Sequence, residues 1–145
     1  MSGRKISVAA VALAGTIAAL ALGRVIWPDP AGAPTPPRDL LPLFVVLSVL
    51  EALAFGAGLA FACFGLAPLR RLGAGAALTW AAHVSISFML VSWWPHDNLH
   101  RVLGHADFAG LAWIEYLFHV PLMAGAAVVA VFFLRIMRGG DRVPA

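Results

Sequence analysis

Residues 40–66 read LLPLFVVLSVLEALAFGAGLAFACFGL, an apolar stretch of 27 residues with a single charged side chain, Glu51. A helix that crosses the hydrocarbon core of a bilayer needs about 20 mostly apolar residues. The stretch exceeds that length with no break in its apolar character. It therefore predicts a transmembrane helix over residues 40–66.

Three further stretches meet the same requirement, and they cover residues 6–27, 73–94 and 108–134. A proline-rich link over residues 28–38 joins the first two spans, whereas only the short turn 67–71 joins the second to the third. A connection that short predicts an antiparallel helical hairpin. The expected fold class is therefore all-α: a four-helix transmembrane bundle that forms a single integral membrane domain over residues 1–145.

The composition agrees with a membrane protein. Hydrophobic residues make up 61% of the chain and charged residues 12%, against about 25% charged in an ordinary soluble domain. The basic residues lie in short clusters at the ends of the apolar stretches, where lipid head groups would meet them. We therefore expect the bilayer as a partner and no nucleic acid. The single cysteine, Cys63, excludes an intrachain disulfide.

Lysine and arginine collect at one end of the predicted bundle. Seven of the ten lie there: Arg4, Lys5, Arg70, Arg71, Arg135, Arg138 and Arg142. The other end receives Arg24, Arg38 and Arg101, together with four tryptophans near the helix ends, Trp27, Trp93, Trp94 and Trp113. Basic residues favour the cytoplasmic side, and tryptophans form belts at membrane interfaces. We therefore expect a multi-pass protein of the cell membrane with both termini in the cytoplasm.

The first apolar stretch also admits a second interpretation. Arg4 and Lys5 before an apolar run, with Ala31-Gly32-Ala33 downstream, are the parts of a cleaved signal peptide. However, the run is long for a signal core, and the small-residue site lies well beyond its end. We therefore interpret the stretch as a retained helix.

Small residues recur at every fourth position in two of the predicted spans. They are Gly15, Ala19 and Gly23 in the first span, and Ala54, Gly58 and Ala62 in the second. In lipid this spacing lets two helices approach closely. We interpret both stripes as packing within one bundle; the alternative is association with a second copy or with another membrane protein.

Four ionisable side chains lie inside the predicted spans: Glu51, His83, Glu115 and His119. Such groups are costly in lipid and usually face the bundle interior. At a rise of about 1.5 Å per residue, Glu51, His83 and His119 each lie about 16–17 Å from the outer ends of their predicted helices. Glu115 and His119 share one helix face because they are four residues apart. The sequence therefore predicts a polar layer at mid-membrane.

This layer is compatible with several uses. Imidazole and carboxylate together suit a metal ion such as iron, zinc or manganese, held by Glu51, His83, Glu115 and His119. Alternatively, His83 and His119 on adjacent helices would be the axial ligands of a haem b, an arrangement that resembles small membrane b-type cytochromes. A proton relay uses the same residue types. The remaining alternative is structural, with the carboxylates hydrogen-bonded to the histidines.

The connection between the third and fourth spans is rich in histidine and aspartate. Pro95 at a helix start predicts a short interfacial helix that ends at Gly104. His96 and His100 share a face of that helix, a spacing by which two imidazoles reach one metal ion. His105 and Asp107 complete a second candidate metal cluster. The alternative is an amphipathic turn whose histidines face water.

Taken together, these patterns predict a small membrane protein that binds a metal ion or haem at its intramembrane glutamates and histidines. Two other classes stay open. One is a non-catalytic accessory subunit of a membrane complex. The other is a membrane enzyme that uses the Glu/His pairs for acid–base chemistry on a lipid-soluble substrate; the residue pattern does not define which side chains would be catalytic.

Overall fold

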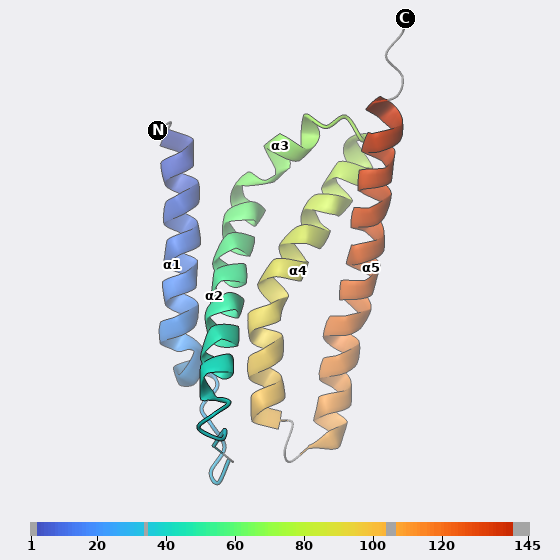
Figure 1. Cartoon of the computed structure of the whole chain (residues 1–145). Coiled ribbons are helices and arrows are strands. Elements are labelled where there is room, and N and C mark those ends of the chain that lie inside the picture. The colour runs from blue at the N-terminus through green and yellow to red at the C-terminus, as the bar shows by residue number, and fades with distance from the viewer. Residues whose placement is uncertain (1–2, 34, 104–106, 141–145) are drawn as a thin grey trace, which may run out of the picture.

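The computed structural model describes residues 3–33, 35–103 and 107–140. Within these ranges the chain is helical, without strands. The helices are α1 (Gly3–Ile26), α2 (Leu41–Phe64), α3 (Leu66–Arg70), α4 (Ala76–Leu103) and α5 (Phe108–Gly140). The four long helices stand side by side in chain order, and the main contacts join α1 to α2, α2 to α4 and α4 to α5 (Figure 1).

The two ends of this bundle differ in what they contain. We call the end with the start of α1, with α3 and with the end of α5 the terminal end (Figure 1). The opposite end, near Ile26, Leu103 and Phe108, holds the α1–α2 and α4–α5 connections and is called the loop end. The antiparallel order of α2 and α4 is the predicted hairpin.

All four long helices are long and apolar enough to cross a membrane. Many of their large apolar side chains are exposed, including Val25, Leu117 and Met123 at 67–73%. Exposed apolar surface on this scale marks contact with lipid or with another protein rather than with water. The predicted four-helix architecture is confirmed, and its apolar surface is that of a membrane protein.

Small residues set the contact between α1 and α2. The buried side of α1 consists of Gly15, Thr16, Ala19 and Gly23. A Cβ at Gly56 of α2 would lie 2.2 Å from the carbonyl oxygen of Ala12, so only glycine fits there. At Gly58 a Cβ would meet Val91 of α4 at 2.7 Å. Both glycines therefore let helices of the same chain pack closely. The sequence predicted this for Gly58 but not for Gly56, and Ala62 of the predicted stripe is exposed.

Helix α4 differs from its prediction. The sequence predicted a span that ends at Trp94 and a separate interfacial helix from Pro95, but residues 76–103 form one helix with Pro95 inside it. Pro95 frees the carbonyl of Val91, four residues earlier, and transmembrane helices tolerate such an interruption more readily than soluble helices do. The predicted helix end, Gly104, lies outside the described residues.

The loop end is held together by contacts between α4 and the α1–α2 connection. Arg101 forms an ion pair with Asp29, and its Nη2 donates to the Trp27 carbonyl over 2.7 Å. The ring of Trp94 packs against those of Trp27 and Phe55 at centroid distances of 4.9 and 4.7 Å. These contacts fix the loop-end part of α4, which carries the histidines discussed next.

Candidate functional site

Two pairs of polar side chains meet where the loop-end part of α4 lies against α5. His96 and His100 are four residues apart on α4, and Glu115 and His119 are four residues apart on α5. Residues at this spacing project from the same face of a helix. Because α4 and α5 pack together, the two faces oppose each other. We call these four residues the His/Glu cluster.

Short contacts link all four members of the His/Glu cluster. Nε2 of His100 lies 3.0 Å from Oε1 of Glu115 and 3.0 Å from Nε2 of His96. The other carboxylate oxygen, Oε2, is paired with Nδ1 of His119. The rings of His96 and His119 meet edge to face, 4.9 Å apart. Glu115 therefore links His100 of α4 to His119 of its own helix.

The ligand atoms of His96, His100 and Glu115 all lie within 4.8 Å of one another. Bonds of about 2.0–2.1 Å in a tetrahedral zinc site place neighbouring ligand atoms roughly 3.3–3.4 Å apart. The cluster is thus close to the spacing that one metal ion requires, and small side-chain rotations would complete it.

The cluster is open to its surroundings. The side chains of Glu115 and His119 are 43% and 47% exposed, and that of His100 is 30% exposed. Glu115 lies about 10 Å along α5 from the helix start at Phe108. The cluster is therefore near the loop end and is not enclosed by the described helices.

Glu51 lies elsewhere, on the interface between α2 and α4. Its side chain is buried and lies next to that of Asp97 on α4. The predicted interfacial helix contained Asp97 in its first turn, and the sequence did not bring it near Glu51, because that proximity depends on the extension of α4 past Trp94.

His83 lies far from the His/Glu cluster. It is buried beside the rings of Phe61 and Trp80, with centroids 5.4 and 5.8 Å away. Its Nδ1 has no hydrogen-bond partner among the described residues. At a rise of about 1.5 Å per residue, His83 is about 20 Å along α4 from His96, which contacts His119.

Glu51, His83 and His119 therefore do not form the predicted common layer, and His83 and His119 are not placed to hold one haem between them. The prediction was wrong because it measured the depth of His83 from Trp94. Helix α4 continues to Leu103, which adds about 13 Å and moves His83 toward the terminal end.

The predicted outer cluster is divided. His96 and His100 join Glu115 and His119, whereas Asp107 caps α5 by accepting a hydrogen bond from the Gly110 amide over 2.9 Å. His105 lies outside the described residues. The sequence analysis assigned His96 and His100 to one site and Glu115 to another. The pattern that connects them is an i, i+4 pair of polar residues in each of two helices that are joined by a short link.

The His/Glu cluster thus combines three imidazoles and one carboxylate from two packed helices. Three of these side chains offer ligand atoms that lie within 4.8 Å of one another, and the fourth, His119, is paired with Glu115. Comparison of the chain with protein-family models, with curated proteins and with solved structures finds no match.

Proposed function

We propose that this chain is a multi-pass membrane protein that binds a divalent first-row transition metal ion, such as Zn²⁺, at the His/Glu cluster. The observation that supports this most directly is the convergence of ligand atoms from His96, His100 and Glu115 within 4.8 Å. Imidazole suits zinc, copper, iron and nickel, and carboxylate suits harder ions. The mixed donor set therefore favours a divalent ion of intermediate softness.

Each member of the cluster has a distinct role in this proposal. His96, His100 and Glu115 are the ligands. His119 pairs with Glu115 through Nδ1 and Oε2 and so orients the carboxylate, as hydrogen-bond partners of metal ligands commonly do. Three protein ligands leave a fourth position open, which water or a further ligand would occupy.

Binding is favoured over metal-dependent hydrolysis by the position of Asp97. In helical His-x-x-x-His zinc sites of metalloproteases, an acidic residue directly after the first histidine is the general base. Asp97 follows His96 but lies next to Glu51 on α2, whereas His100 pairs with Glu115 on α5. The carboxyl group of Asp97 therefore lies on the side of α4 that faces α2, away from the His/Glu cluster.

The proposal predicts one Zn²⁺ ion per chain after purification in detergent, removal of bound metal with a chelator and titration with Zn²⁺. His100→Ala should lower the stoichiometry well below one, because it removes a ligand from the centre of the cluster. His83→Phe is the matched control, since it removes an imidazole far from the cluster and keeps a ring between Phe61 and Trp80. Equal zinc content in the wild type and His100→Ala would contradict the proposal.

We also propose that the terminal end of the bundle faces the cytoplasm. Six basic residues of the described chain lie at that end: Arg4, Lys5, Arg70, Arg71, Arg135 and Arg138. The loop end has Arg24, Arg38 and Arg101. This asymmetry supports the orientation in which both helix ends near the termini are inside, and it puts the His/Glu cluster on the outer side.

The orientation predicts the labelling of single cysteines in intact cells. In a Cys63→Ser background, Ala31→Cys in the α1–α2 connection should react with a membrane-impermeant thiol reagent. Gly139→Cys at the end of α5 should react only after the cells are permeabilised. The reverse pattern would place the His/Glu cluster on the cytoplasmic side.

A further inference from the structure

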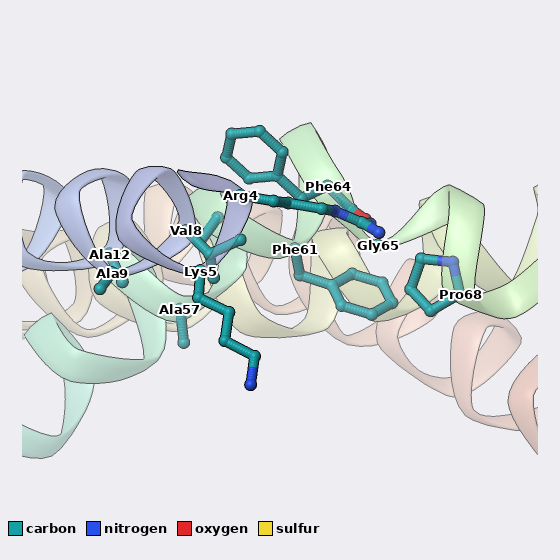
Figure 2. A pocket seen from close by; sticks show the side chains of 11 residues that line it. Arg4, Lys5, Val8, Ala9, Ala12, Ala57, Phe61, Phe64, Gly65 and Pro68 are labelled. Atoms are coloured by element: carbon teal, nitrogen blue, oxygen red, sulfur yellow. The ribbon is translucent and has the colours of Figure 1, made fainter. Parts of the chain in front are cut away.

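A groove runs between α1 and α2 at the terminal end of the bundle, with a volume of about 660 Å³. Alanines line much of it, and aromatic rings lie at its α3 end (Figure 2). The residues used below are Ala9 and Ala12 of α1, Ala57 and Ala60 of α2, and the rings of Phe61 and Phe64. The surface of the groove is thus almost wholly apolar.

The groove follows from how α1 and α2 pack. Around Gly15 and Gly56 the two helices approach so closely that an added Cβ at either glycine would meet the other helix at 3.0 Å or less. One or two turns nearer the terminal end, the facing residues are alanines, whose side chains are too short to fill the space between the helices. The result is an open apolar furrow.

Basic side chains from the first turn of α1 stand at the rim of the groove. Arg4 lies along the rim near Phe64, and Lys5 extends to the other side (Figure 2). Nη2 of Arg4 donates to the Phe64 carbonyl over 2.8 Å, which leaves four of the five guanidinium N–H donors for other acceptors. Arg70 and Arg4 together line a smaller adjoining hollow of about 320 Å³.

The acidic residues of the described chain all lie away from this rim. Asp29, Asp39, Glu51, Asp97, Asp107 and Glu115 belong to the loop-end half of the bundle. Within the described ranges, no carboxylate therefore neutralises Arg4 or Lys5. The rim carries positive charge next to an apolar furrow.

We propose that this groove binds an anionic phospholipid, with the phosphate at Arg4 and Lys5 and an acyl chain along the alanines. Basic pockets between transmembrane helices on the cytoplasmic side are suited to anionic head groups, and the apolar furrow runs from the rim toward the middle of the bundle. The groove volume also fits a flexible chain better than a helix. A helix about 10 Å wide would fill 660 Å³ in less than two turns.

Native mass spectrometry of the full chain with an equimolar mixture of phosphatidylglycerol and phosphatidylcholine tests this proposal. The wild type should retain phosphatidylglycerol in clear excess. The double variant Arg4→Gln/Lys5→Gln should lose that preference, by about fivefold for each basic side chain removed. The matched control is Arg135→Gln/Arg138→Gln, which removes two charges at the same end from α5 and should keep the preference.

A second variant tests the furrow itself. Ala57 is exposed on the groove wall, so Ala57→Phe should fill the furrow without entering the contact between α1 and α2. We expect it to reduce retention of both lipids. Equal losses from the two double variants would overturn the proposal in favour of unspecific surface charge. Unchanged phosphatidylglycerol preference in Arg4→Gln/Lys5→Gln, or unchanged retention in Ala57→Phe, would also overturn it.

Discussion

Glu115→Gln is expected to weaken Zn²⁺ binding by more than about 100-fold, since loss of an outer-shell partner alone typically costs 10–100-fold. The amide keeps the shape of the side chain but loses the negative charge and is a much poorer ligand. The same change replaces one of the two carboxylate oxygens, which pair with His100 and His119, by an amide NH2 that cannot accept a hydrogen bond. These pairs are half exposed, so their loss should alter the free energy of unfolding of the metal-free protein little.

Zinc affinity measured by competition with a chelator, together with the melting temperature of the metal-free protein, would check this expectation. Asp39→Asn is a suitable control because it removes an exposed carboxylate at the same end of the bundle, outside the cluster. His119→Ala should have a smaller effect than Glu115→Gln, because His119 orients the ligand instead of providing it. Wild-type affinity in Glu115→Gln would show that zinc, if bound, is bound elsewhere.

Gly56→Ala is expected to lower the free energy of unfolding by about 1–3 kcal/mol, the range for overpacking a close contact. The new methyl group would lie 2.2 Å from the Ala12 carbonyl oxygen and 2.8 Å from the Thr16 amide nitrogen. Both atoms belong to the backbone of α1 and cannot rotate away, so the helices must separate. Because lipid is as apolar as the side chains, no hydrophobic force holds the two helices together, and their association depends on close packing. Separation of the helices is therefore destabilising.

Thermal unfolding in detergent, followed by tryptophan fluorescence, would measure this loss. The contact between Trp27 and Trp94 reports on the position of α1 at the loop end. Gly139→Ala is the control, since a Cβ there meets nothing within 4 Å. It should be neutral or slightly stabilising because alanine favours a helix over glycine. If Gly56→Ala were as stable as Gly139→Ala, the inference that α1 and α2 are in close contact at Gly56 would be wrong.

The sequence alone predicted the number, type and approximate positions of the long helices. An apolar stretch such as residues 40–66 is a local property, because each residue contributes to the free energy of transfer into lipid independently of the fold. The spacing of Gly15, Ala19 and Gly23 likewise predicted a close helix contact. Proline did not mark the end of α4, because the helix continues through Pro95, as transmembrane helices can.

Only the tertiary structure decided which polar side chains meet. The spacing of polar residues within each helix can be read from the sequence. Whether Glu115 faces His100, however, depends on the rotation and register of α5 against α4. Those are set by packing between helices, which no local stretch encodes. The continuation of α4 beyond Trp94 moved His83 about 13 Å from its expected depth and brought His96 and His100 opposite Glu115. Composition therefore determined which segments are long and apolar enough to cross a membrane. Helix packing decided where the histidines and the glutamate converge.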